Sequence, residues 1–305
     1  MNTNETNEVP LEPQIEPGRT GFFRRIKKWL IYLTIFYVMF VGLLAMNENS
    51  LVYPGSSVKR GNWMPNFPFE EIEFQSGDGT KLVGWYLPYP GATEYVLHCH
   101  GNAENVAQSA QHSGLKFQAA LNANVFVFDY RGYGKSEGSP YEAGVLADAE
   151  AALEWLNQRS QTKPTDIIFS GHSIGGGPAV HLATKFGGKA LFLQRTFSSL
   201  VEPAQNKFWF VPVSLIMQNR FESAEKIKNC DVPIHQSHGD LDSLVPIESG
   251  RKIFENSPAT HKEFFVNKGK SHWDRLPLAY WQSVQEFVSM INHCQEIETV
   301  SRKLR

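Results

Sequence analysis

Short apolar runs alternate with helix-like segments from Phe69 to the end of the chain, and this alternation restricts the folds that the chain can adopt. Such a pattern is typical of a mostly parallel sheet that helices cover on both faces. The first two runs, at 69–74 and 82–88, are separated by a turn and predict a hairpin with an antiparallel edge. The later expected strands lie within residues 95–101, 124–130, 166–173, 189–197, 233–240 and 262–272. We therefore expect one α/β domain over residues 69–305.

An uncharged apolar stretch from Trp29 to Met46 precedes this domain. As a helix it would span about 27 Å, close to the ~30 Å hydrocarbon core of a bilayer. One alternative is a cleaved signal peptide, which would have a shorter apolar core and small residues at the cleavage point. The other is a buried core helix, which is rarely apolar on every face. We therefore expect residues 29–46 to form a transmembrane helix in contact with the lipid bilayer.

The two flanks of this stretch differ in composition. Residues 1–28 begin acidic and proline-containing and end basic, which predicts a disordered tail. Five basic residues precede the apolar stretch, and Lys59 and Arg60 follow it. Because cytoplasmic flanks carry an excess of Lys and Arg, the tail is predicted to be cytoplasmic, with the α/β domain on the opposite side of the membrane. Residues 47–68 are expected to be a connector.

The charge balance and the cysteine count exclude two classes of protein. The chain has 29 Lys plus Arg against 31 Asp plus Glu, without the basic excess of a nucleic-acid-binding protein. Three cysteines are too few, and too odd a number, for a fold built on disulfides. No nucleic-acid partner is expected, and the oligomeric state is left open.

The motif Gly171–Gly175 (GHSIG) lies where an expected strand ends and a helix begins. A G-x-S-x-G pattern in this setting holds a serine, here Ser173, on a sharp turn with its hydroxyl above the sheet. The alternative is a plain glycine-rich turn with a helix-capping serine. Because a serine hydroxyl needs a base, and the base needs an orienting acid, the chemistry depends on partners elsewhere in the chain.

Candidate partners follow in the order Ser, acid, His that this architecture uses. After Ser173 the chain supplies Asp240 and Asp242 and then His272, all just past expected strands. Since the carboxyl ends of parallel strands meet at one edge of a sheet, these side chains are expected to converge. Asp240 and Asp242 both remain candidates for the acid, whereas Asp274 lies too near His272 in sequence to be the usual partner.

Backbone N–H groups beside the serine are expected to bind the negatively charged oxygen of a reaction intermediate. In this architecture one donor belongs to the residue after the serine, here Ile174, and the other to the loop after the third strand, which we assign to Asn102. His98 and His100 lie two residues apart on that strand, as a metal-binding pair would. A simpler role for His100 is to position the turn that begins at Gly101. No bound metal is therefore expected.

Six segments occur in the order found in a known family: LVYPG, HGNAENV, FDYRGYGKSEGSP, GHSIGGGPA, HGDLDSLVP and GKSHWD. Over Leu51 to Trp273 the chain resembles the α/β-hydrolase superfamily. More narrowly, it resembles the membrane-anchored α/β-hydrolase domain proteins near acylglycerol lipases, protein depalmitoylases and serine aminopeptidase-like hydrolases. The resemblance implies an eight-stranded α/β-hydrolase fold with Ser173 as nucleophile, Asp242 as acid and His272 as base. It also implies that neither a metal nor an organic cofactor takes part.

The segment after the expected sixth strand departs from this resemblance. Many relatives have a Glu-Ser-Pro-Phe type sequence there, whereas this chain has Gln194-Arg195-Thr196-Phe197. The segment adjoins the acyl pocket, so Phe197 is a candidate lining residue. The apolar stretch at 208–217 is either an ordinary packing helix or a small lid. As a lid it would add Phe208, Trp209 and Met217 to the pocket.

These features together predict a membrane-anchored serine hydrolase that cleaves carboxylic ester or thioester bonds through a Ser-His-Asp triad and an acyl-enzyme. A lipid-derived acyl group or an acylated protein would suit a tethered enzyme, but fold and anchor do not fix a substrate. One alternative is a serine aminopeptidase-like peptidase, for which the sequence offers no identifiable acidic pocket. The other is a catalytically silent binding module with the same fold.

Overall fold

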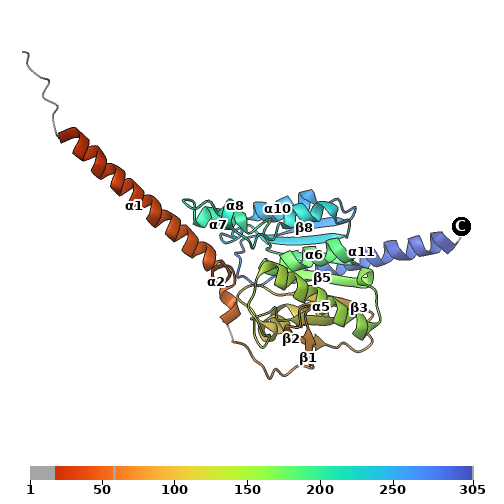
Figure 1. Ribbon diagram of the computed structural model, residues 1–305. Helices are drawn as coiled ribbons and strands as arrows, with labels where there is room; N and C mark the ends of the chain where they lie inside the picture. The colour runs from red at the N-terminus through yellow and green to blue at the C-terminus, as the bar shows by residue number, and fades with distance from the viewer. Residues whose placement is uncertain (1–17, 58–59, 304–305) are drawn as a thin grey trace, which may run out of the picture. The chain divides into compact units, whose positions relative to one another are not determined.

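The computed structural model describes residues 18–57 and 60–303, which divide into two units. Over its described residues the first unit, which ends at Asn47, contains one long helix, α1 (Gly18–Met46). The second unit begins at Glu48 and contains the sheet and the other described helices (Figure 1).

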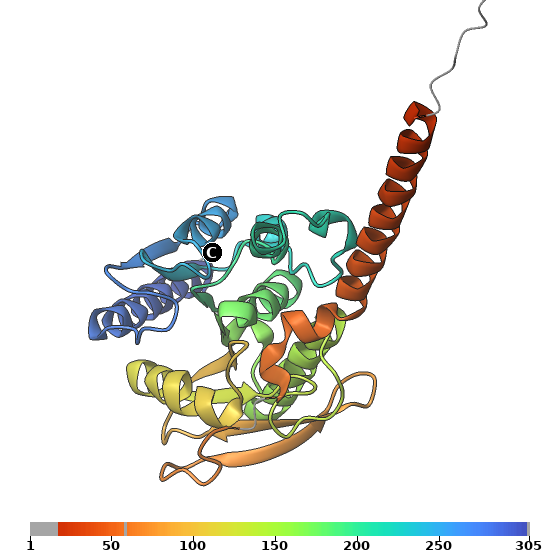
Figure 2. The ribbon, with the colours of Figure 1, turned by 90° about the vertical axis from the view of Figure 1, so that its left-hand side faces the viewer.

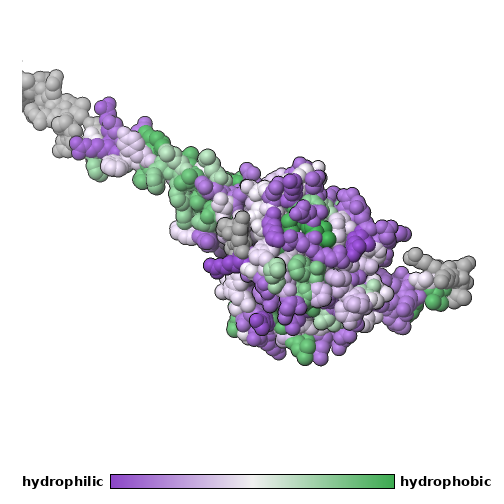
Figure 3. Space-filling model, turned by 90° about the horizontal axis from the view of Figure 1, so that it is seen from below, coloured by the Kyte–Doolittle hydropathy of each residue, from purple (hydrophilic) through white to green (hydrophobic). Residues whose placement is uncertain are grey.

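Helix α1 contains the stretch predicted to cross a membrane. None of its most apolar window is buried, whereas the core helix of a soluble protein is mostly buried. In Figure 3 the helix is green, hence hydrophobic, along much of its length and purple at its basic N-terminal end. The helix begins at Gly18 rather than at Trp29, so residues 18–28 are helical and the expectation of disorder is wrong for them. Arg and Lys are good helix formers, and this allows the helix to extend through the basic segment. Residues 1–17 of the predicted tail lie outside the described part.

An eight-stranded sheet forms the centre of the second unit, in the order β1-β2-β4-β3-β5-β6-β7-β8. The strands are β1 (Glu70–Gln75), β2 (Lys81–Leu87), β3 (Glu94–Cys99), β4 (Ala123–Phe128), β5 (Ile167–His172), β6 (Ala190–Gln194), β7 (Ile234–Gly239) and β8 (Lys262–Asn267). Strands β1 and β2 form the predicted antiparallel hairpin, and β2 is also antiparallel to β4. The remaining neighbours are parallel, so the expected mostly parallel sheet is confirmed.

Helices cover both faces of this sheet, and a buried apolar cluster lies on each face. Along β4, Phe126 and Phe128 belong to one cluster and Val125 and Val127 to the other, because successive strand residues point to opposite faces. The first face is covered by α5 (Glu142–Ser160), α6 (Gly176–Phe186) and α10 (Ile247–Asn256). The second is covered by α3 (Val106–Ser109), α4 (Leu115–Leu121) and α11 (Leu278–Lys303). Figure 2 shows α4 (yellow) and α11 (blue) on the same side of the sheet.

Shorter elements join these layers. Residues 48–57, expected to be part of a connector, form α2 (Glu48–Val52) and a 3-10 turn (Pro54–Ser57). The stretch between β6 and β7 contains α7 (Val201–Lys207), α8 (Val213–Ile216) and α9 (Ser223–Lys226). These elements position the loops at the carboxyl ends of β3, β5, β6, β7 and β8, where the candidate site residues lie.

Candidate active site

Ser173 lies on a tight turn between β5 and α6. Its φ is 53°, in the left-handed region that few residues other than glycine adopt. A Cβ added to Gly171 would overlap the carbonyl oxygen of Gly175, and one added to Gly175 would overlap the carbonyl oxygen of Cys99 on β3. The glycines are therefore needed for close backbone approach, and the motif forms the predicted strand–turn–helix.

Ser173, His272 and Asp242 form a continuous chain of hydrogen bonds. His272 Nε2 lies 3.1 Å from Ser173 Oγ, and His272 Nδ1 lies 2.7 Å from Asp242 Oδ2. Because an ionised carboxylate can only accept, Nδ1 carries the proton and Nε2 is left to accept from the serine hydroxyl. In this tautomer an imidazole can act as a base toward a serine.

The environment of Asp242 favours its ionised form. Burial raises the pKa of Asp242, but hydrogen bonds from His238, His272 and the Val245 N–H outweigh burial and hold the pKa below its usual value. Asp242 Oδ1 accepts from the N–H groups of Leu244 at 3.0 Å and Val245 at 2.8 Å. His238 Nε2 lies 3.5 Å from Oδ2 and 2.8 Å from the Val245 carbonyl oxygen. The carboxylate is thus both charged and fixed in orientation.

The two rival acids form hydrogen bonds elsewhere. Asp240 Oδ1 accepts from the Gly269 N–H at 2.6 Å. Asp274 Oδ2 accepts from the backbone N–H and the hydroxyl of Ser271, both at 2.7 Å. Of the three carboxylates, the one bonded to His272 is that of Asp242, as the resemblance implied.

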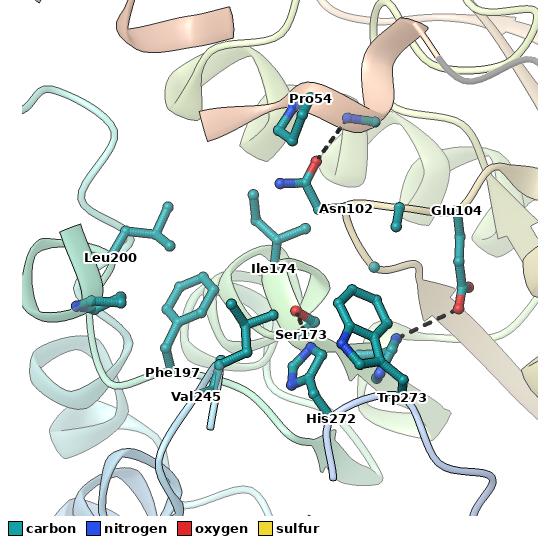
Figure 4. A pocket seen from close by; sticks show the side chains of 16 residues that line it. Pro54, Asn102, Glu104, Ser173, Ile174, Phe197, Leu200, Val245, His272 and Trp273 are labelled. Atoms are coloured by element: carbon teal, nitrogen blue, oxygen red, sulfur yellow. Dashed lines mark hydrogen bonds and ion pairs between the residues drawn. The ribbon is translucent and has the colours of Figure 1, made fainter. Parts of the chain in front are cut away.

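A cavity of about 390 Å³ opens beside Ser173 and His272, near the lower end of the size range of ligand pockets (Figure 4). Asn102 and Ile174, the predicted oxyanion donors, both line this cavity. Most of its wall is apolar, and the apolar lining residues include Ile174, Phe197, Leu200, Leu244, Val245 and Trp273. The cavity is suited to a hydrophobic group attached to a carbonyl at Ser173.

Of the four predicted pocket residues, Phe197 lines the cavity. The other three lie outside its lining, so the structure corrects the expectation for Phe208, Trp209 and Met217. Trp209 lies between α7 and α8 with its side chain 79% exposed. The stretch at 208–217 is therefore neither a single packing helix nor a wall of this cavity, because the chain leaves α7 at Lys207 and forms only the short helix α8, with Trp209, Phe210 and Leu215 exposed.

One part of the cavity wall is polar. Glu104 Oε1 lies 3.7 Å from His172 Nδ1, and the His172 ring stacks on that of His272 with centroids 5.7 Å apart. Burial raises the pKa of Glu104 and lowers the pKa of His172, so both shifts favour the uncharged forms. We expected no role for either residue from the sequence, although both lie within recognised motifs.

The segment that departs from the family pattern supports the site. Arg195 Nη1 donates to the backbone carbonyl of His272 at 2.9 Å, and Thr196 Oγ1 donates to the carbonyl of Ser173 at 2.8 Å. From the sequence, Phe197 is the residue of this segment predicted to have a role. The signal in the sequence that could have indicated a supporting role was the charged residue Arg195 directly after the apolar run of β6.

The two strand histidines have separate partners. His98 Nδ1 lies 3.0 Å from Ser170 Oγ, and His100 Nδ1 lies 2.8 Å from the Gly101 carbonyl oxygen. Within residues 18–57 and 60–303, no three His, Cys, Asp or Glu side chains are grouped as ligands of a metal ion.

Comparison with known proteins agrees with this architecture. Residues 94–201 match the family described as "alpha/beta hydrolase fold". Protein bem46 of Schizosaccharomyces pombe is 30% identical over 265 residues, which cover 82% of this chain and 88% of that protein. An uncharacterized membrane protein of Saccharomyces cerevisiae is 28% identical, with 81% and 91% covered. An esterase structure from Pyrococcus furiosus superposes with a TM-score of 0.62 at 22% identity, over 75% of this chain and 96% of the esterase, and shows the shared fold. The chain therefore belongs to the α/β-hydrolase fold family, in the group of homologues that includes Bem46.

Proposed function

We propose that the protein is a membrane-anchored serine hydrolase that cleaves carboxylic ester or thioester bonds. The observation that carries this proposal is the hydrogen-bonded chain from Asp242 through His272 to Ser173, beside an apolar cavity. The hydrolase fold, with esterases among its structural neighbours, agrees with this reaction class.

In the proposed reaction the Ser173 oxygen attacks the substrate carbonyl carbon while His272 Nε2 takes the hydroxyl proton. Asp242 stabilises the imidazolium that forms, and the N–H groups of Asn102 and Ile174 donate to the developing oxyanion. His272 then gives the proton to the leaving alcohol or thiol, which leaves an acyl group on Ser173. A water molecule, deprotonated by His272, attacks this acyl-enzyme, releases the carboxylic acid and restores the serine.

The lining of the cavity favours an ester or thioester over a peptide with a free N-terminus. A peptidase of that kind needs an acidic side chain to hold the α-amine. Glu104 is the acidic residue of the described cavity lining, but burial raises its pKa and its carboxyl faces His172. A carboxyl biased toward its neutral form is a poor partner for an ammonium group. The apolar wall, in contrast, suits an acyl chain of modest size.

The proposed localisation follows from α1. Its apolar part is long enough to cross a bilayer, and a relative of the chain is described as a membrane protein. The basic residues that precede residues 29–46 favour a cytoplasmic N-terminus. We therefore assign the hydrolase domain to the opposite side of the membrane.

Labelling of the full-length protein in detergent with a fluorophosphonate probe tests the proposed function. We expect the adduct on Ser173, and we expect Ser173→Ala to abolish it and to lower hydrolysis of p-nitrophenyl butyrate by about 10⁴-fold or more. Ser139→Ala is the control, because Ser139 is an exposed serine in another loop.

Folded wild-type protein without an adduct on Ser173 would contradict the proposal and favour the silent binding module. Near-normal turnover in Ser173→Ala would indicate a different nucleophile. Faster turnover of amino-acid p-nitroanilides than of esters would favour the peptidase alternative.

A further inference from the structure

Residues 48–55, here called the post-helix segment, follow α1 and contact the loop that carries Asn102. The Asn102 side-chain amide donates from Nδ2 to the Val52 carbonyl oxygen at 2.5 Å. Its Oδ1 accepts from the Gly55 N–H at 3.4 Å and from the Tyr133 hydroxyl at 2.6 Å. Both ends of the amide therefore form hydrogen bonds, and two of the three bonds are to the post-helix segment. Figure 4 shows one of them as a dashed line from the Asn102 side chain to the segment that carries Pro54.

Gly55 also packs on the main chain of Asn102. A Cβ added to Gly55 would overlap the Asn102 carbonyl oxygen and would lie 3.1 Å from the Tyr133 ring. Pro54 and Gly55 line the same cavity as Asn102 and Ser173. A residue without a side chain is needed here because the two backbones approach so closely.

The post-helix segment is itself anchored to the rest of the second unit. The Glu48 carboxylate accepts from the backbone N–H groups of Gln218 at 3.0 Å and Asn219 at 2.6 Å. Tyr53 is 1% exposed and donates its hydroxyl to Asn219 Oδ1 at 2.9 Å. Because the segment is itself held in place, it can fix the position of the loop that it contacts, as residues that support an active site must do.

We propose that residues 52–55 are a positioning element for the oxyanion loop, which hold Asn102 with its N–H directed at the oxygen that becomes negative during attack by Ser173. This inference rests on the serine-hydrolase function proposed above. The side chain and the carbonyl of Asn102 are both restrained by this segment, so the direction of its N–H depends on it. A preorganised donor stabilises the transition state only when it is placed accurately. Residues that follow the membrane helix therefore act as part of the active site.

The variant Gly55→Ala in the full-length protein tests this role. We expect kcat for p-nitrophenyl butyrate to fall by about 10- to 100-fold with KM within about twofold, because an oxyanion donor acts on the transition state more than on bound substrate. Affinity for an alkyl boronic acid, which mimics the tetrahedral intermediate, should fall by the same factor as kcat/KM. The control is Gly77→Ala in the β1–β2 turn, where an added Cβ has no atom within 4 Å. Its kcat should equal that of the wild type.

Thermal unfolding of both variants separates misplacement of the loop from loss of the fold. Should Gly55→Ala fail to fold, Tyr53→Phe decides, because it keeps the buried ring and removes only the hydroxyl that anchors the segment to Asn219 Oδ1. A several-fold fall in its kcat at unchanged KM supports the positioning role. Wild-type kcat in the folded variant, or a change confined to KM, overturns it. A wild-type protein that neither hydrolyses esters nor is labelled at Ser173 defeats the hydrolase function itself.

Discussion

Two residues with left-handed backbones lie at the ends of neighbouring strands in the site. Ser173 follows β5 with φ 53°, and Arg195 follows β6 with φ 51°. Such conformations cost about 1–3 kcal/mol each and persist only where the surrounding structure holds them. Here the Thr196 hydroxyl bonds the Ser173 carbonyl, and Arg195 bonds the carbonyl of His272. The strained turn presents the serine hydroxyl to His272, and the buried guanidinium of Arg195 holds the loop that carries His272.

The variants Asp242→Asn and Asp240→Asn test which of the two carboxylates orients His272. The amide at 242 no longer stabilises an imidazolium and favours the wrong tautomer of His272, so kcat should fall by about 10⁴-fold. The carboxylate of Asp240 accepts from the Gly269 N–H, outside the reacting chain, so its variant should keep kcat within about twofold. The kcat of each variant is measured with p-nitrophenyl butyrate on folded protein. Equal losses in the two variants would contradict the assignment of the acid.

The sequence predicted the three side chains that the structure brings together in a hydrogen-bonded chain, because each follows an expected strand and the carboxyl ends of parallel strands meet at one edge of the sheet. The pattern of residues left the choice of acid between Asp240 and Asp242 open because both lie in the same loop. In the structure the two carboxylates are held in different places by different backbone N–H donors, that of Val245 for Asp242 and that of Gly269 for Asp240. The supporting contacts of Arg195 could not be predicted, since its partner is 77 residues away in sequence. Contacts of that kind depend on which strands become neighbours.

At the level of elements, the strands and long helices were predictable because each long helix of the second unit contributes recurring apolar residues to one buried cluster and the central strands contribute theirs to both. Short elements gave no such periodicity. Helices α2 and α8 have five and four residues, too few to complete two turns, and were missed. Their positions depend instead on tertiary hydrogen bonds, such as that from the Gln218 N–H to Glu48. For this reason the apolar character of the stretch at 208–217 could not decide between a packing helix and a lid.

The variants Phe197→Leu and Trp209→Leu test the corrected pocket. Phe197 is buried in the cavity wall, whereas Trp209 is exposed outside it. Replacing the ring of Phe197 by a smaller group enlarges the cavity, so the ratio of kcat/KM for p-nitrophenyl octanoate to that for the butyrate should rise by about tenfold. The same ratio should be unchanged in Trp209→Leu when soluble esters are assayed. A shift in the exposed variant comparable to that in Phe197→Leu would return the 208–217 stretch to the pocket.

For the whole molecule, the connection between anchor and hydrolase domain is very short. Helix α1 ends at Met46, and Glu48 already belongs to the second unit, where it begins α2. A single residue therefore links the proposed membrane helix to the segment that contacts the oxyanion loop. The proposed anchor is therefore followed directly in the sequence by residues that line the candidate site.

The proposed side of the membrane for this domain follows from the charges around the apolar helix. Five basic residues precede residues 29–46 and two follow them, so the N-terminus should be retained in the cytoplasm. Labelling of single introduced cysteines tests this topology in a Cys294→Ser background, where the remaining Cys99 and Cys230 are buried. The variant Thr3→Cys reports the side of the N-terminus, and Gly77→Cys reports the side of the hydrolase domain. In intact bacterial cells a membrane-impermeant maleimide should label the cysteine at 77, and the cysteine at 3 should react only after permeabilisation. Exchanging the basic residues at 24–28 for serine should weaken or invert this pattern, because the charge difference is its physical cause. Labelling of position 3 alone in intact cells, with the basic residues present, would overturn the proposed topology and assign the hydrolase domain to the cytoplasm.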